Sequence, residues 1–287
     1  MKKAISTWSF PVEMDLAARM SLAKSVGFEG LEVSLDDDPD GSLARRGFLT
    51  WQQMEETAPV VKQAAEEIGV GIPSVAIGIG WQYQLTADDP AQRAQAVEVH
   101  KQGIRAARRL GLDDVLIVPG VVDACFAPVV PPVPYDVCYR RAVESVRELL
   151  PVAEENRVRL GLEPVWNMFL LSPLEWVSFV DGFGSPWAKV YMDLGNVLIT
   201  GYPEQWIRIL GSRINRVHVK DYKRSVADLD AFVRLLEGDV NFPACMAALR
   251  EVGYDSWLTA EIMPISPYAP TFLVQESALA MDLILAM

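Results

Sequence analysis

The sequence has few of the side chains that build disulfide frameworks or histidine-rich metal clusters. Its 287 residues include three cysteines and two histidines, and the cysteines at positions 125, 138 and 245 form no CxxC pair. Widely spaced single cysteines are typical of a reducing compartment and argue against a cysteine-bound structural zinc. We therefore expect a cytoplasmic protein without structural zinc.

Long apolar runs and positive charge are also scarce. No stretch reaches the length of about 18 apolar residues that a membrane-spanning helix needs. The two lysines near the start are followed by Glu13 and Asp15 instead of the apolar core of a signal peptide. Lys and Arg number 26 against 38 Asp and Glu, and the resulting net charge of −12 repels a phosphate backbone. We expect neither a membrane nor a nucleic acid as partner.

What the sequence does contain is an alternation of strand-like and helix-like segments. Strand-like runs recur eight times, from about residues 3–7 to about 257–261, each followed by a connection or helical segment. Alternating units favour a parallel sheet, and eight of them favour a closed (β/α)8 barrel. No change in composition divides the chain. We therefore expect residues 1–287 to form a single TIM-barrel domain of the α/β class.

The lengths of the connections indicate which end of the barrel carries function. Helix-to-strand connections are short and contain glycine, whereas long strand-to-helix connections lie at 36–47, 119–134 and 221–241. The second of these contains five prolines, which suits a stiff lid. In a (β/α)8 barrel the site lies at the C-terminal ends of the strands, where these connections are.

Four consecutive strands end on side chains that bind divalent metals. Glu163, Asp193, His218 and Glu261 close the fifth to eighth expected strands, which are neighbours in such a barrel. Three carboxylates and one imidazole suit a hard or borderline ion. We expect one divalent metal ion, with Mn²⁺ first and Mg²⁺ or Co²⁺ as alternatives. The competing interpretation is a set of ordinary barrel-end carboxylates paired with Lys220 or with arginines.

These ligand types predict proton abstraction next to a carbonyl group. A metal that chelates a carbonyl and the neighbouring hydroxyl stabilises an enediolate as a Lewis acid. Glu163 and Glu261 belong to different strands, so one is able to take a proton while the other returns one to the opposite face. That exchange inverts the carbon. A single group that moves the proton between adjacent carbons gives aldose–ketose isomerisation instead.

Further candidates for contacting a substrate lie at the same end. Trp8 follows the first strand and Trp81 the third, and aromatic walls suit sugar rings, although tryptophans at barrel ends also serve as plain packing. Asn196 is a candidate for binding a hydroxyl group. Lys220 points to the same side of its strand as the expected histidine ligand. Glu32 lies inside the second strand, where a buried acid needs a partner, so we expect it either to support a site residue or to form a structural ion pair.

Several motifs resemble the xylose-isomerase-like superfamily of sugar isomerases and epimerases. They span nearly the whole chain: Gly-Phe-Glu-Gly-Leu-Glu-Val-Ser (27–34), Leu-Glu-Pro (162–164), Met-Asp-Leu-Gly-Asn (192–196), Val-His-Val-Lys-Asp (217–221), Glu-Gly-Asp-Val-Asn-Phe (237–242) and Thr-Ala-Glu-Ile (259–262). Within the superfamily, the chain most resembles L-ribulose-5-phosphate 3-epimerases and ketose 3-epimerases of the tagatose/psicose type. The resemblance implies that Glu163, Asp193, His218 and Glu261 hold the metal, and that Glu163 and Glu261 form the catalytic acid/base pair.

Two departures from the family pattern concern the substrate. Asn196 stands where ketose 3-epimerases carry a histidine, as in the phosphate-epimerase branch. Residues 80–85 are neutral and partly aromatic where that branch is basic, which favours a neutral sugar or a larger glycoside. We expect an isomerase that carries out metal-dependent C3 epimerisation of a ketose or keto-sugar through a cis-enediolate.

Two alternatives retain part of this interpretation. A metal-dependent lyase of the C-glycoside-cleaving or dehydratase type begins with the same proton abstraction, but its keto-sugar has a leaving group β to the carbanion. A non-catalytic sugar-binding barrel keeps aromatic walls but has no need of two glutamates on the metal. The resemblance also implies a homodimer or homotetramer as the assembly.

Overall fold

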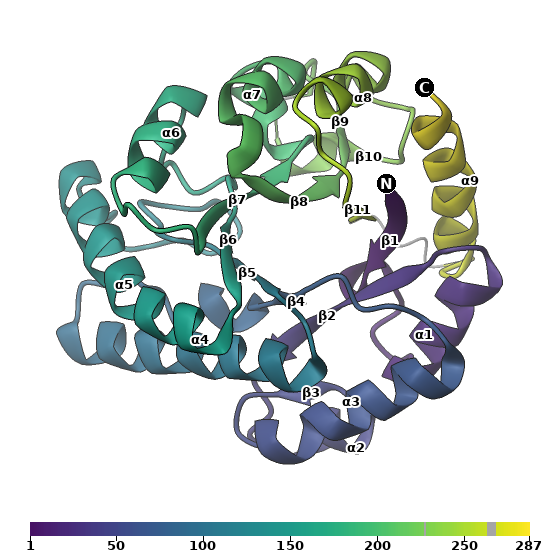
Figure 1. The fold of residues 1–287 in the computed structure, drawn as a ribbon, viewed down its shortest axis with the longest axis horizontal. Helices are drawn as coiled ribbons and strands as arrows, with labels where there is room; N and C mark the ends of the chain where they lie inside the picture. The colour runs from purple at the N-terminus through teal and green to yellow at the C-terminus, as the bar shows by residue number, and fades with distance from the viewer. Residues whose placement is uncertain (227, 263–267) are drawn as a thin grey trace.

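Eight parallel strands close into a barrel in a computed structural model of the chain, which describes residues 1–226, 228–262 and 268–287 (Figure 1). In chain order the barrel strands are β1 (Lys2–Ser6), β2 (Gly30–Asp36), β4 (Val75–Ala76), β5 (Asp114–Ile117), β6 (Arg159–Leu162), β7 (Ala188–Asp193), β8 (Ile214–Val219) and β11 (Trp257–Ala260). Each strand pairs with the next, and β1 pairs with both β2 and β11. The predicted (β/α)8 TIM barrel is confirmed.

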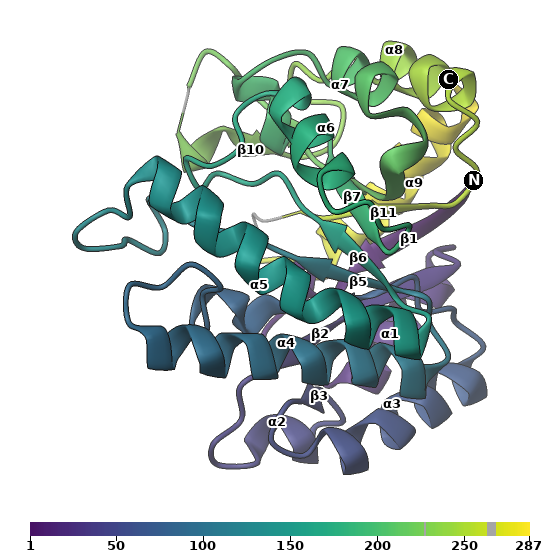
Figure 2. The ribbon, with the colours of Figure 1, turned by 60° about the vertical axis from the view of Figure 1, so that its left-hand side comes forward.

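Helices surround the barrel, and the long loops gather at the end opposite the N-terminus (Figure 2). The helices of more than one turn are α1 (Leu16–Ser25), α3 (Met54–Ile68), α4 (Pro90–Leu110), α5 (Tyr135–Asn156), α6 (Pro173–Asp181), α7 (Pro203–Leu210), α8 (Phe242–Glu251) and α9 (Phe272–Ala286). Local chemistry sets their limits: Asp89 caps the first turn of α4, and Gly111, in the left-handed region at φ 81°, ends it. None of the described helices combines the length and apolar character needed to cross a membrane.

The long connections contain short elements that periodicity did not predict. The first holds the one-turn helix α2 (Ser42–Arg45) and leads to β3 (Leu49–Thr50), which pairs with β2 outside the barrel. The last holds β9 (Asp221–Tyr222) and β10 (Phe232–Val233), which pair antiparallel. Two-residue strands are too short for an alternation to be recognised. The barrel strand β4 also has only two residues, and Pro73 just before it has no N–H for the ladder.

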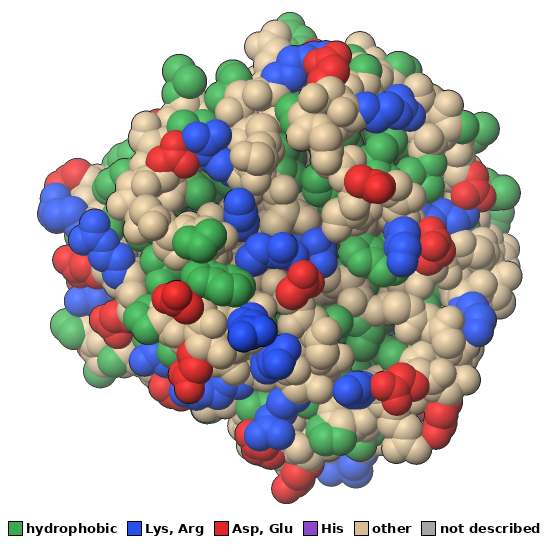
Figure 3. Space-filling view, viewed as in Figure 1, with side chains coloured by type: hydrophobic (Ala, Val, Ile, Leu, Met, Phe, Trp, Pro, Cys, Tyr) green, Lys and Arg blue, Asp and Glu red, His purple; other side chains and the backbone are tan. Residues whose placement is uncertain are grey.

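Alternate strand residues fill the barrel interior in layers, as in other barrels of this kind. The strands begin on the face shown in Figure 3, where basic and acidic side chains gather around the centre. There Asp114 of β5 pairs with Arg216 of β8 at 2.5 Å and with Arg159 of β6 at 2.7 Å. In the next layer Tyr191 of β7 packs against small and aliphatic side chains of β4 and β5. The barrel interior therefore contains a layer of paired charges near the strand starts, and the strand ends lie above it.

Candidate active site

The ends of β6, β7, β8 and β11 bring together four side chains that could hold a metal ion. Each of Glu163, Asp193, His218 and Glu261 offers one ligand atom, and these atoms all lie within 4.8 Å of one another. All four residues are buried. Nδ1 of His218 lies 2.8 Å from Oε2 of Glu261 and 3.2 Å from Oε1 of Glu163. These are the four residues that the strand-end pattern selected, and parallel strands bring them to one edge of the sheet.

The chemistry of this donor set fits a divalent cation. Three buried carboxylates converge on one imidazole nitrogen, an arrangement in which like charges need a cation between them. Oδ2 of Asp193 is buried and accepts no hydrogen bond from any described residue, although Nζ of Lys220 lies 3.1 Å away. Three oxygen donors and one nitrogen suit a hard or borderline ion. Glu163, Asp193, His218 and Glu261 would hold that ion.

Glu32 of β2 orients the imidazole from behind. It is fully buried, and its Oε2 lies 2.8 Å from Nε2 of His218. Its Oε1 accepts hydrogen bonds from Ser74 at 2.6 Å and Tyr191 at 2.5 Å. An imidazole that donates from Nε2 presents the lone pair of Nδ1 to the ligand cluster. The expectation that Glu32 contacts the substrate is corrected here, because its carboxylate lies behind His218 and not on the cavity wall.

Lys220 brings positive charge to the cluster. Its Nζ lies 2.9 Å from Oε2 of Glu261 and donates to Oδ1 of Asn196 at 3.5 Å. Burial opposes the charge, but the carboxylates of Asp193 and Glu261 outweigh burial and raise the pKa of Lys220. This ammonium is the cation that the alternative interpretation of the strand-end carboxylates required. It forms ion pairs with Asp193 and Glu261 but, among the described contacts, none with Glu163.

The two glutamates hold protons with different strengths. Burial raises the pKa of Glu163 to about 7. Burial also acts to raise the pKa of Glu261, but in the metal-free site the charges of Lys220 and of protonated His218 overcome it and lower that pKa to about 2. Two carboxyl groups whose surroundings push their proton affinities apart are suited to the roles of acid and base.

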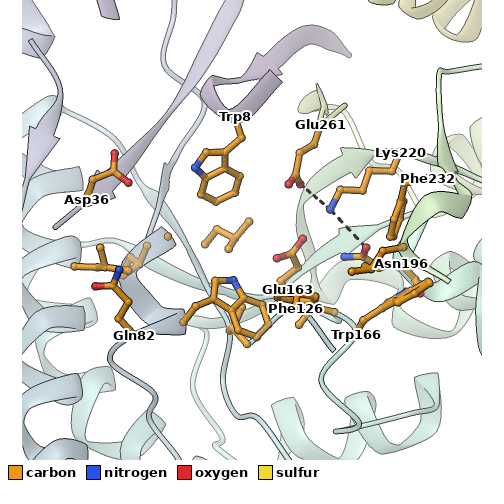
Figure 4. Close-up of a pocket in the computed structure, with 18 of the residues that line it drawn as sticks. Trp8, Asp36, Gln82, Phe126, Glu163, Trp166, Asn196, Lys220, Phe232 and Glu261 are labelled. Carbon is orange, nitrogen blue, oxygen red and sulfur yellow. Dashed lines mark hydrogen bonds and ion pairs between the residues drawn. The ribbon is translucent and has the colours of Figure 1, made fainter. Parts of the chain in front are cut away.

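A cavity of about 770 Å³ opens above the cluster (Figure 4). Glu163, Glu261, Lys220 and Asn196 lie at one side of it, and Trp8 lies across from them. Trp81 also lines the cavity. Apart from Glu32, the residues expected to contact a substrate therefore surround one space. A largely apolar cavity with a few convergent polar groups is the usual form of a small-molecule site.

Three aromatic residues of the cavity wall were not among the sequence candidates. Phe126 packs edge-on against Trp81, with ring centroids 4.6 Å apart. Trp166 and Phe232 pack together with centroids 5.1 Å apart, and Nε1 of Trp166 donates to the backbone oxygen of Asn196. All three lie in strand-to-helix connections. Connection length drew attention to two of these segments, but periodicity does not say which loop side chain faces inward.

Residues 20–281 match the model of the xylose isomerase-like TIM barrel family. The chain belongs to this family. Among curated members, the L-ribulose-5-phosphate 3-epimerase of Salmonella paratyphi C is 30 % identical over 245 residues, which cover 82 % of this chain and 78 % of that protein. Relatives of this kind are sugar epimerases, which are isomerases. The predicted family and the isomerase class are thereby confirmed.

Solved structures agree on the fold. A D-tagatose 3-epimerase-like protein superposes with a TM-score of 0.79 at 18 % identity, covering 100 % of this chain and 97 % of its own. The IolI protein, solved with a bound zinc atom, superposes with a TM-score of 0.78 at 13 % identity and covers 100 % of this chain and 98 % of its own. At identities this low, the superpositions show a common barrel fold alone. The reaction has to be inferred from the site residues.

Proposed function

We propose that this member of the xylose isomerase-like family is a divalent-metal-dependent epimerase that inverts C3 of a ketose or keto-sugar through a cis-enediolate. The observation that carries the proposal is the approach of Glu163 and Glu261 to His218 from two different strands. The 3-epimerase named among the curated relatives supports the choice of reaction. The donor set favours Mn²⁺, with Mg²⁺ or Co²⁺ as alternatives.

The mechanism divides the work between the two glutamates. One carboxylate accepts the C3 proton, and the other, in its protonated form, returns a proton to the opposite face. Their strands are separated around the barrel by β7 and β8, so the two groups flank the space between them. A bound divalent ion supplies stabilisation of the enediolate charge. Lys220 and Asn196, at the edge of the same space, donate hydrogen bonds to substrate oxygens.

Solvent exchange at C3 tests the proposal. The Mn²⁺-loaded protein is incubated in D₂O with a panel of ketoses, and NMR follows deuterium and new epimers. We expect deuterium at C3 together with an epimer. Replacing either glutamate by glutamine (Glu163→Gln, Glu261→Gln) slows this exchange at least about 100-fold, as expected for loss of a general acid or base. Glu148→Gln, on the exposed face of α5, is the matched control and keeps the rate.

Two results overturn the proposal. Loss of a substituent from the sugar without formation of an epimer assigns the site to a lyase. Tight binding of sugar and metal without any exchange assigns it to a non-catalytic binding protein.

A further inference from the structure

The cavity is larger than one reacting sugar requires. At the roughly 30 Å³ that a water molecule occupies in the liquid, the twelve non-hydrogen atoms of a hexose fill at most about 360 Å³. The cavity measures about 770 Å³, so more than half of it remains. This remainder extends away from Glu163 and Glu261 toward Asp36 and Gln82 (Figure 4).

The far part of the cavity combines aromatic rings with free polar groups. Trp8 lies between the glutamates and Asp36 (Figure 4). Trp81, which precedes Gln82 in the chain, also lines the cavity. A Cβ atom at Gly78 would lie 2.8 Å from the Trp8 ring, so only glycine there lets the indole rest against the chain. Oδ2 of Asp36 accepts from Ser34 at 2.5 Å, and Oδ1 has no donor among the described residues. Carboxylate and amide side chains beside flat rings match the hydroxyl groups and apolar faces of a pyranose.

The charge of the lining argues against a phosphate. Five acidic residues line the cavity: Asp36, Asp37, Glu163, Asp230 and Glu261. Lys220 is the only basic residue among the lining residues that the structure describes, and it already pairs with Asp193 and Glu261. A phosphate group needs arginine, lysine or the N-terminus of a helix. Lys220 lies beside the glutamates, so among the described lining residues the far part of the cavity offers no cationic partner to the phosphorylated ketose in the name of the curated relatives.

We propose that the far part of the cavity is a subsite for a second sugar ring. The substrate is then an unphosphorylated ketose or keto-sugar that carries a glycosyl group away from C3. This inference rests on the proposed epimerase function for its reacting end. Trp8 and Trp81 pack against the glycosyl ring, while Asp36 and Gln82 bind its hydroxyl groups.

Ligands that differ only in the substituent test the subsite. Calorimetry measures the affinity of the Mn²⁺-loaded protein for D-fructose, for its 6-O- and 4-O-glucosyl derivatives, and for D-fructose 6-phosphate. We expect at least one disaccharide to bind at least tenfold more tightly than fructose, and the phosphate ester to bind no more tightly than fructose. Equal affinities for fructose and both disaccharides, or a preference for the phosphate ester, overturn the proposal.

Variants locate the effect. Trp81→Ala and Asp36→Asn reduce disaccharide affinity at least about tenfold more than they reduce fructose affinity, whereas Asp40→Asn, at an exposed position in the same connection, changes neither. Equal losses for both ligands would mark Trp81 and Asp36 as merely structural and overturn the assignment.

The two proposals fail separately. Disaccharide selectivity without deuterium exchange overturns the epimerase and retains the subsite. Deuterium exchange on fructose without disaccharide selectivity overturns the subsite and retains the epimerase.

Discussion

The orientation of one imidazole controls the geometry of the cluster that we propose to bind a metal ion. Glu32 fixes the ring of His218 by accepting from Nε2, and Tyr191 and Ser74 in turn fix Glu32. We expect Glu32→Gln to weaken Mn²⁺ affinity about 10- to 100-fold, because a neutral amide no longer holds the ring or raises its basicity. Titration calorimetry measures the affinity, with Glu148→Gln as control. Unchanged Mn²⁺ affinity would show that the hydrogen bond from His218 to Glu32 does not contribute to metal binding.

His100 is a buried histidine away from the cluster. The structure encloses it fully within α4, with Nδ1 2.7 Å from the backbone oxygen of Ala96. Burial lowers its pKa from 6.5 to about 4. Between these two values the unfolded chain binds more protons than the folded one, so stability falls as the pH drops from 6.5 toward 4.

The pH dependence of unfolding tests the state of His100. Lowering the pH from 8 to 5 protonates His100 in the unfolded chain but hardly in the folded one, where its pKa is about 4. This difference lowers the free energy of unfolding by about 2 kcal/mol. In His100→Gln that contribution is absent. Urea titrations of both proteins at the two pH values measure it, and an identical pH dependence in the variant would contradict the assignment.

Among the elements, the segment after β8 depends on a single carboxylate. Asp221 accepts hydrogen bonds from the backbone N–H groups of Tyr222 at 2.9 Å, Gly238 at 2.8 Å and Val240 at 3.2 Å. These bonds close the connection that places Phe232 on the cavity wall.

Asp221→Asn should therefore loosen this connection locally. Loss of the charge weakens the three hydrogen bonds to residue 221 by about 2 kcal/mol in total. We therefore expect amide hydrogen exchange in residues 228–241 to become about 30-fold faster. Mass spectrometry of exchanging peptides measures the rate, and α4 serves as the internal reference. Equal acceleration in α4 would mean that the substitution lowers global stability instead.

The sequence predicted the eight barrel strands and the convergence of four strand-end side chains, because both follow from the alternation of strands and helices. Parallel strands end at one edge, so a carboxylate or histidine closing each strand identifies the cluster without coordinates. The contact of Glu32 with Tyr191 was not predictable in this way, since it depends on the stagger that brings β2 and β7 to one level inside the barrel. Trp166 and Phe232 were missed for a related reason, because loop paths follow no period.

For the whole molecule, the cluster joins strands from the second half of the barrel to the strand that closes it. Glu163, Asp193 and His218 come from β6, β7 and β8, while Glu261 follows β11, which pairs with β1. A metal that binds only the folded chain stabilises it by about 2.7 kcal/mol at a free concentration of 100 times its Kd.

Chelation should therefore lower the Tm of the protein, and added Mn²⁺ should restore it. Scanning calorimetry measures both changes. In Asp193→Asn the Mn²⁺-dependent shift shrinks because one charged ligand is lost. A Tm that is indifferent to chelator and to Mn²⁺ would contradict a metal centre in the barrel.

The acidic lining of the cavity also bears on how quickly different molecules enter it. An electronegative mouth speeds the arrival of cations and slows that of anions, and dissolved salt weakens both effects over a Debye length of about 10 Å at 0.1 M. Rising ionic strength then slows the uptake of Mn²⁺, hastens the entry of phosphate esters and leaves neutral sugars unaffected. We therefore expect the barrel mouth to select among metabolites by charge, through their rates of entry, before any of them reaches the glutamates.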